Sequence, residues 1–278
     1  MSRIILITGA MGFVGRQLLQ SISKKDVSIR IIVREGKNIP NEFLGIVDKI
    51  IETKDLFAES VKWWEDTLKG VDTIIHAAWY VEPGKYLYSP KNIDCLIGTL
   101  NLARGASKAS VRRFVGIGTC FEYDLTCDVL TTETALNPIT PYAGAKVAAY
   151  YALSQYFVST NIEIAWCRLF YLYGEGEDSR RLVPYLRQKL EAGDPAKLSH
   201  GNQIRDMLDV KEAGKMIAAV ALGDTHGAVN ICSGIPITIR QFVEKIADQY
   251  KRRDLLMFGA REEDPIAPKC VVGVKTKL

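Results

Sequence analysis

The sequence has few of the residues from which metal sites and disulfide frameworks are built. Its 278 residues include three histidines, and its six cysteines contain no Cys-x-x-Cys pair. Zinc sites and disulfide frameworks both show such residues at short, regular spacings. We therefore expect no metal site, and we expect reduced thiols, the usual state of cysteine in the cytoplasm.

A membrane segment, a leader and a nucleic-acid-binding stripe are also missing. No run approaches the roughly 18 apolar residues of a membrane-spanning helix, and the first residues lack an apolar core that leads to a cleavage site. The net charge is +4, and the Lys and Arg residues are interspersed rather than gathered in a stripe with aromatics. The sequence therefore predicts a cytoplasmic protein with no membrane segment and no nucleic-acid partner.

The chain alternates short β-branched runs with helical patterns. Nearly continuous apolar strands that are joined by helices indicate an α/β fold with a doubly wound parallel sheet of the Rossmann type. The predicted strands lie at 4–7, 29–33, 50–51, 73–76, 114–117 and 164–169, and the predicted helices at 13–23, 60–68, 92–108 and 142–159.

The alternation weakens in the C-terminal part, where glycine and proline divide the chain into short pieces. We expect a dinucleotide-binding domain at 1–169 and a smaller C-terminal lobe at 170–278 that mainly binds substrate. A helical pattern at 216–221 and a strand pattern at 229–231 predict that segments near 205–232 return to the Rossmann domain.

A glycine-rich turn follows the first predicted strand and opens the first predicted helix. Gly9 permits the tight turn, Gly12 lets a pyrophosphate approach bare backbone, and Gly15 lets the helix pack closely on the strand. The helix N-terminus then faces the phosphates with its free N–H groups. In this strand-turn-helix context the motif predicts a dinucleotide site. The residues expected to contact the cofactor here are Gly9, Met11, Gly12, Phe13, Val14 and Gly15.

The end of the second predicted strand indicates which dinucleotide is bound. Arg34 and Glu35 stand there, about 20 residues beyond the motif, where an acid would bind the ribose of NAD. A guanidinium suits the 2′-phosphate of NADP, because it forms paired, charge-assisted hydrogen bonds. Since Arg34 comes first, the sequence favours NADP(H) over NAD(H), with Arg16 as a second candidate contact. The alternative is that Arg34 only caps the strand and Glu35 binds the ribose.

Further motifs follow in a fixed order along the chain. They are Asp-Leu at 55–56, DTIIHAA at 72–78, TCFEY at 119–123, YAGAK at 142–146, RLFYLYG at 168–174, QIRD at 203–206 and NICSG at 230–234. With these motifs the chain resembles the NAD-dependent epimerase/dehydratase family of extended short-chain dehydrogenases over nearly its whole length. The resemblance implies that Asp55 and Leu56 contact the adenine, and that Ala77 and Ala78 lie below the cofactor.

Tyr142 and Lys146 are the candidate catalytic pair, and their spacing of four places them on one face of a predicted helix. The resemblance assigns Lys146 to the nicotinamide ribose and makes Tyr142 the acid that protonates a carbonyl oxygen as hydride arrives. We expect the charge of Lys146, with that of an oxidised nicotinamide, to lower the pKa of Tyr142. Thr119 stands where the family has Ser or Thr and is expected to hydrogen-bond the same oxygen.

The residues after Thr119 depart from the family's 4,6-dehydratases, in which an acidic pair follows the catalytic Ser or Thr. This chain has Cys120 and Phe121 there, and neither can supply that acid and base, because a thiol of ordinary pKa stays protonated. Dehydration is therefore not expected, and both residues are candidates for substrate contact. Glu122 either hydrogen-bonds the substrate or is a structural carboxylate. Tyr171, where the family usually has Asn, is a further substrate candidate.

Arginines and an aromatic residue complete the predicted substrate site. Arg205 resembles the family arginine that meets the substrate diphosphate, and Arg180 is a second candidate for that charge. The alternative for Arg205 is a pair with Asp206 alone. Trp79 follows a strand end, where loops of a parallel sheet reach the ligand crevice, so it lines either the sugar pocket or the contact between lobes.

The leading interpretation is NADPH-dependent reduction of a nucleotide-activated 4-keto-6-deoxy sugar to a deoxysugar nucleotide. The first alternative is a nucleotide-sugar 4-epimerase with tightly bound NAD. The second is a non-catalytic NADP-binding sensor on the same fold, which the presence of both Tyr142 and Lys146 disfavours. The resemblance also implies a homodimer, formed through the predicted helices at 92–108 and 142–159.

Overall fold

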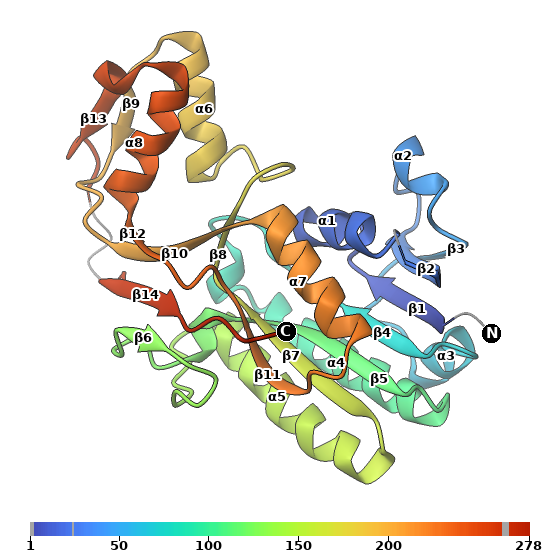
Figure 1. Cartoon of the computed structure of the whole chain (residues 1–278). Coiled ribbons are helices and arrows are strands. Elements are labelled where there is room, and N and C mark those ends of the chain that lie inside the picture. The colour runs from blue at the N-terminus through green and yellow to red at the C-terminus, as the bar shows by residue number, and fades with distance from the viewer. Residues whose placement is uncertain (1–2, 24, 263–266) are drawn as a thin grey trace.

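Seven parallel strands form the main sheet of the molecule (Figure 1). The computed structural model describes residues 3–23, 25–262 and 267–278. From one edge of the sheet to the other, the strands are β11 (Gly227–Ile231), β7 (Glu163–Leu169), β5 (Arg113–Thr119), β4 (Thr73–His76), β1 (Arg3–Thr8), β2 (Val27–Arg34) and β3 (Lys49–Thr53).

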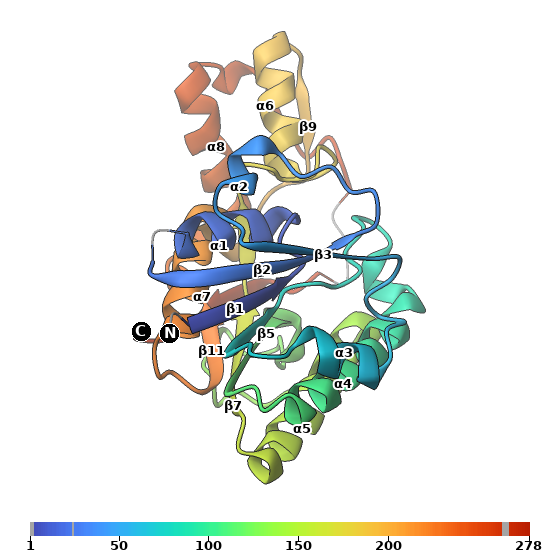
Figure 2. The ribbon, with the colours of Figure 1, turned by 90° about the vertical axis from the view of Figure 1, so that its right-hand side faces the viewer.

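Helices cover both faces of this sheet, because successive residues of a strand point to opposite sides. Ile5 and Ile7 are buried in the core on one side, and Leu6 is buried in the core on the other. The two helix layers are α1 (Phe13–Ile22) with α7 (Val210–Leu222), and α3 (Val61–Thr67) with α4 (Lys91–Lys108) and α5 (Pro141–Thr160). Figure 2 shows these layers on either side of the strands. The doubly wound α/β fold expected from the sequence is confirmed.

The strand order determines which edge of the sheet can bind a ligand. β2 and β3 lie on one side of β1, whereas β4, β5, β7 and β11 lie on the other, so the winding reverses between β1 and β4. Sheets of this kind bind ligands at the carboxyl ends of the strands beside the reversal. Thr8, His76 and Thr119 end β1, β4 and β5, and they mark this edge.

A smaller lobe stands apart from the main sheet, at the top left of Figure 1. The elements outside the main sheet and its helix layers are α2 (Asn41–Leu44), η1 (Tyr86–Tyr88), η2 (Cys120–Glu122), β6 (Val129–Leu130), β8 (Tyr171–Tyr173), α6 (Leu182–Ala192), β9 (Ala196–Leu198), β10 (Ile204–Asp209), β12 (Pro236–Thr238), α8 (Ile239–Tyr250), η3 (Arg253–Leu255), β13 (Leu256–Phe258) and β14 (Cys270–Gly273). In the lobe, α6 and α8 share an apolar core with short strands. β10 pairs with β8, β12 and β14, and β14 pairs with β6. No helix among the described residues combines the length and apolar character needed to cross a membrane.

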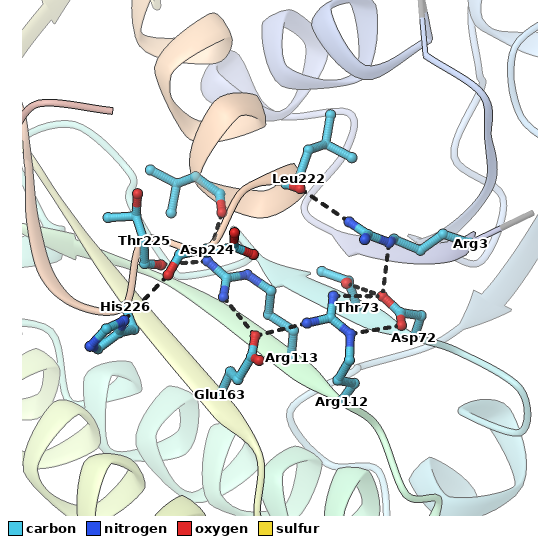
Figure 3. A network of polar contacts seen from close by, with 11 residues as sticks. Arg3, Asp72, Thr73, Arg112, Arg113, Glu163, Leu222, Asp224, Thr225 and His226 are labelled. Carbon is cyan, nitrogen blue, oxygen red and sulfur yellow. Dashed lines mark hydrogen bonds and ion pairs between the residues drawn. The ribbon is translucent and has the colours of Figure 1, made fainter.

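A buried arginine connects the elements at the amino ends of the strands, opposite the ligand-binding ends (Figure 3). Arg113, at the start of β5, is fully buried and donates hydrogen bonds to Glu163 at 2.9 Å, to the Val220 carbonyl at 2.7 Å and to the Thr225 carbonyl. The neighbouring Arg112 is partly exposed. Arg113 therefore links β5 and β7 to the end of α7 and to the turn that precedes β11.

Replacing this arginine is expected to destabilise the fold without touching the ligand-binding edge. Arg113→Met keeps an apolar stem but leaves the carbonyls of Val220 and Thr225 without their donor, which costs about 3 kcal/mol of unfolding free energy. Arg112→Met is the matched control and costs less than about 1 kcal/mol, because its ion pairs are partly exposed. Denaturant unfolding measures both changes. Equal stabilities of the two variants would contradict the assignment.

Candidate functional site

The glycine turn has the shape of a phosphate cradle. Gly9 has φ +69°, and a Cβ atom there would lie 2.6 Å from the Ala78 backbone nitrogen. A Cβ on Gly15 would lie 2.1 Å from the Gly9 carbonyl oxygen, so both positions need glycine. Gly12 is the N-cap of α1 and has no side chain to cap the helix. The N–H groups of the first turn thus stay available to an anion, as a dinucleotide pyrophosphate requires.

The other predicted cofactor residues lie along the same edge. Arg34 is the exposed last residue of β2, and it pairs in register with Thr53 of β3, just before Asp55 and Leu56. Ala77 follows β4, and its N–H donates to the Thr8 carbonyl at 3.2 Å. Met11, Phe13, Val14 and Ala78 lie in the glycine turn, the first turn of α1 and the end of β4. The Arg16 Nε atom donates to the Met11 carbonyl at 3.2 Å, so this side chain lies against the glycine turn.

The structure brings the three candidate catalytic side chains together. Thr119 ends β5, whereas Tyr142 and Lys146 lie in the first two turns of α5, which Thr140 caps by accepting a hydrogen bond from the Ala143 N–H. All three catalytic candidates are buried. Burial raises the pKa of Tyr142, the nearby Tyr86 phenol raises it further, and the Thr119 hydroxyl acts in the opposite direction.

The Tyr142 side chain itself does not show the expected lowering, because burial of the phenol dominates its pKa. The further effect of an oxidised nicotinamide stays a prediction. The Lys146 ammonium donates to the Ile117 carbonyl at 2.6 Å and lies 3.7 Å from the centre of a Trp79 ring. Burial also lowers the pKa of Lys146, to about 7. The charge that should assist the phenol is thus weakened by the same burial that raises the phenol pKa.

Glu122 takes the structural role of the two that the sequence left open. Its carboxylate is fully buried, forms an ion pair with Arg168 at 2.7 Å, and accepts hydrogen bonds from the Trp166 indole at 3.0 Å and the Thr119 N–H at 2.8 Å. Substrate contact by Glu122 is therefore wrong, because its oxygens are occupied by these donors. Its partner Arg168 came from a recognised motif, but only the fold shows that the two side chains meet.

Aromatic side chains surround the catalytic group on its substrate side. The Tyr86 ring lies edge-on to Tyr142 with a centroid distance of 4.9 Å, and Phe121 packs against Tyr171 at 6.0 Å. Burial raises the pKa of the neighbouring Cys120 thiol, so this residue stays protonated. Tyr86 was not among the residues expected at the site. Its only signal in the sequence is a Tyr-Leu-Tyr run in the segment after β4, which is ordinary for a packed loop.

The two predicted substrate arginines lie in different surroundings. Arg205 is buried beside the aromatic group, with its guanidinium carbon 5.1 Å from the Tyr171 ring centre. It does not pair with Asp206, which accepts hydrogen bonds from Ser233 and Gly234, because adjacent strand residues point to opposite faces. Arg180 is exposed and paired with Asp178 at 2.8 Å. Arg205 therefore lies beside the aromatic side chains of the candidate site. Arg180 instead lies on the surface, paired with Asp178.

The chain shares its sequence pattern with a large enzyme family. The model of the NAD dependent epimerase/dehydratase family matches residues 5–232. Among curated proteins, dTDP-6-deoxy-L-talose 4-dehydrogenase (NAD(+)) of Aggregatibacter actinomycetemcomitans is 23% identical over 95% of this chain and 97% of its own length. GDP-6-deoxy-D-mannose reductase of Pseudomonas aeruginosa is 26% identical over 89% of this chain and 80% of its own.

The fold is similar to a solved sugar-nucleotide enzyme. The structure of UDP-N-acetylglucosamine 4-epimerase from Methanobrevibacter ruminantium M1, in complex with UDP-N-acetylmuramic acid, superposes with a TM-score of 0.83. It covers 99% of this chain and 90% of its own, at 21% identity. At that identity the likeness establishes the fold, and the chemistry has to be argued from the site.

Proposed function

The chain belongs to the NAD dependent epimerase/dehydratase family, and from that membership we propose that it reduces a nucleotide-activated 4-keto-6-deoxy sugar to a deoxysugar nucleotide. At the level of the family it is an NAD(P)-dependent enzyme of the oxidoreductase type that modifies a nucleotide sugar. One observation carries the finer proposal. Thr119, Tyr142 and Lys146 converge beside a wall of aromatic rings and a protonated thiol, where a dehydratase would place carboxyl groups.

The residues of this site can do the acid chemistry of a ketone reduction. When bound, the nicotinamide cofactor supplies the hydride that adds to the carbonyl carbon. Tyr142 gives its phenol proton to the oxygen that becomes the alcohol, and the Thr119 hydroxyl holds that oxygen in place. Lys146 contributes a cation on the same helix face. Because the phenol pKa is raised, Tyr142 is fully protonated at neutral pH and ready to act as an acid.

The surroundings of the site support a 6-deoxy sugar as substrate. The walls near Tyr142 are built from Tyr86, Phe121 and Tyr171, which offer apolar ring surface to a methyl group. Arg205 lies next to Tyr171, where its charge suits a diphosphate. Both curated relatives are named for 6-deoxy sugar nucleotides, one for dehydrogenation at position 4 and one for reduction.

For the cofactor we propose NADP(H) in preference to NAD(H). Arg34 ends β2 at the edge where the adenosine ribose would lie, and its side chain is exposed and free to reach a 2′-phosphate. The 4-dehydrogenase relative is named for NAD(+), so Arg34 is the feature that argues for the phosphorylated form in this chain.

For the assembly we propose a homodimer through α4 and α5. Ile93 and Ile97 of α4, with Tyr151 and Val158 of α5, are each more than half exposed, and the two helices pack side by side. Exposed apolar side chains on adjacent helices are typical of a surface that a second subunit covers. Two other apolar side chains of α5, Val147 and Leu153, are instead buried within the chain. The six cysteines are all free thiols, which fits a cytoplasmic location.

Arg34→Ala is expected to raise the Michaelis constant for NADPH about ten- to a hundredfold, the loss of a charge-assisted contact. The constant for NADH should change little, because NADH carries no 2′-phosphate. Arg30→Ala is the control on the same strand, since Arg30 lies four residues before Arg34 and its guanidinium donates to the Lys69 carbonyl. Steady-state kinetics with both cofactors measure the effect. An equal change for NADPH and NADH would refute the NADP assignment.

Light scattering at micromolar concentration is expected to give the mass of a dimer. Ile97→Lys places a charge in the proposed interface and should give the mass of a monomer. Ile235→Lys is the control, because Ile235 is an exposed apolar residue of the small lobe, outside α4 and α5. A wild-type monomer, or a dimer that survives Ile97→Lys, would overturn the interface.

A panel of nucleotide 4-keto-6-deoxy sugars, assayed with NADPH and with NADH, tests the reaction itself. We expect consumption of the added reduced cofactor, one equivalent for each equivalent of product. An epimerase would instead purify with tightly held NAD and would convert its substrate with no cofactor added. A sensor would turn over none of the panel.

Tyr142→Phe is the matching variant for this assay. It removes the phenol oxygen and keeps the ring, so cofactor binding should persist while turnover falls about a hundred- to ten-thousand-fold, the contribution of a positioned general acid. Thr119→Val should cost less, because the acid remains. Wild-type turnover by Tyr142→Phe would exclude the proposed mechanism.

A further inference from the structure

The Lys146 ammonium is packed against the face of an aromatic ring. Trp79 stands just beyond the end of β4, and the ammonium nitrogen lies 3.7 Å from the centre of one of its rings. One of the three N–H bonds of the ammonium points to the Ile117 carbonyl. A cation at this distance from an indole face is attracted by the negative potential of the ring, and the attraction is strongest where water is excluded. Lys146 is almost fully buried, so water is excluded from its contact with the indole.

A buried asparagine fixes the orientation of this indole. The Trp79 Nε1 atom donates to the Asn92 Oδ1 atom at 2.9 Å. Asn92 has no exposed surface, and its amide nitrogen donates to the carbonyls of Tyr86 at 2.7 Å and Ser89 at 2.9 Å. The three hydrogen bonds therefore join the Asn92 amide, at the start of α4, to the segment between β4 and α4. Since the indole edge is held by Asn92, its face is turned toward Lys146.

The same loop also contacts the second member of the catalytic pair. Tyr86, whose carbonyl is held by Asn92, presents its ring at 86° to the Tyr142 ring. The segment from Trp79 to Asn92 thus touches Lys146 with one aromatic side chain and Tyr142 with another. Neither Trp79 nor Tyr86 is itself proposed to donate or accept the catalytic proton.

We propose that Trp79, locked in place by Asn92, is a positioning residue that holds Lys146 in its charged form and aims it along the catalytic face of α5. The role of Lys146 rests on the proposed function. The contact itself does not, because it is a feature of the folded chain without substrate. Trp79 was predicted to line the sugar pocket or the contact between lobes, and this proposal gives it a different task.

The need for such support follows from the surroundings of Lys146. The titratable groups near it are His76 from β4, Cys95 from α4 and Glu122 from η2, with Tyr142 one turn earlier on α5. A second indole, that of Trp166, lies farther from the ammonium, at 6.0 Å. Burial lowers the pKa of His76 to about 3, so this ring is neutral. Glu122 raises the pKa of Lys146 from a distance, but its oxygens are committed to Arg168, and burial outweighs its effect. Since burial lowers the Lys146 pKa to about 7, loss of the cation–π contact would lower the charged fraction of the amine further at neutral pH.

The test is a titration of Lys146 in the intact protein by NMR with lysine labelled at Cε. The Lys146 signal is identified by its absence from a Lys146→Met variant. Trp79→Leu removes the ring and should lower the Lys146 pKa by about one pH unit, the size of a buried cation–π contact. Trp79→Phe keeps an aromatic face but loses the hydrogen bond to Asn92, so it should show a smaller shift than Trp79→Leu. Trp63→Leu is the matched control, because this tryptophan packs edge-on against Trp64 in α3 and should leave the titration unchanged.

The pH profile of kcat/KM with the active substrate gives a second measurement. A lysine whose folded pKa is lowered loses its charge as pH rises through that value, so the alkaline limb of the profile should move to lower pH in Trp79→Leu. An unchanged Lys146 titration in Trp79→Leu would overturn the positioning role, whatever the enzyme reduces. A shifted titration in a protein that reduces none of the panel would instead overturn the proposed function alone.

Discussion

The buried ion pair of Glu122 and Arg168 is the interaction on which the site depends. Its carboxylate accepts the Thr119 N–H from the end of β5, while the Arg168 guanidinium lies between the rings of Tyr123 and Tyr150, at 4.6 and 4.9 Å. Tyr150 belongs to α5, the helix that also carries the candidate catalytic residues Tyr142 and Lys146. One charged pair therefore connects the strand that ends in Thr119 with the helix that faces it. Removing either partner would leave a buried charge uncompensated, which costs several kcal/mol.

The same cluster reaches into the C-terminal half of the chain. The Tyr123 hydroxyl donates to Asn230 of β11 at 2.6 Å, and the Asn230 amide donates to the carbonyls of Leu130 and Val274. The segments that carry the site thus share a continuous set of buried polar bonds. Rigidity of this kind is what a reaction with one hydride and one proton requires, because both must arrive at the same carbonyl group in a fixed geometry.

Local sequence patterns predicted the fold and the centre of the site. The glycine turn, the apolar strands and the Tyr142/Lys146 spacing depend on residues close together in the chain, so their geometry follows from backbone periodicity alone. Strand periodicity also explains why Arg205 and Asp206 do not pair with each other. The roles of Glu122 and Trp79 could not be predicted in this way. Glu122 meets a side chain 46 residues further along, and such pairs are decided by how strands and helices pack.

Burial has opposite consequences for the two members of the catalytic pair. It keeps the phenol protonated, as an acid requires, but it also weakens the cation that should assist the phenol. The aromatic face beside the lysine, turned by a buried amide, offsets part of that cost. Exclusion of water, which hydride chemistry needs, therefore also disfavours the charged form of Lys146.

The proposed reaction requires direct hydride transfer from the nicotinamide to C4 of the sugar. Single turnover with NADPH that carries deuterium at C4 of the nicotinamide follows this hydride, with the product analysed by mass spectrometry and NMR. One deuterium is expected at C4 of the sugar, delivered from one face of the nicotinamide only. A product without deuterium, formed while the added NADPH remains unoxidised, would rule the transfer out.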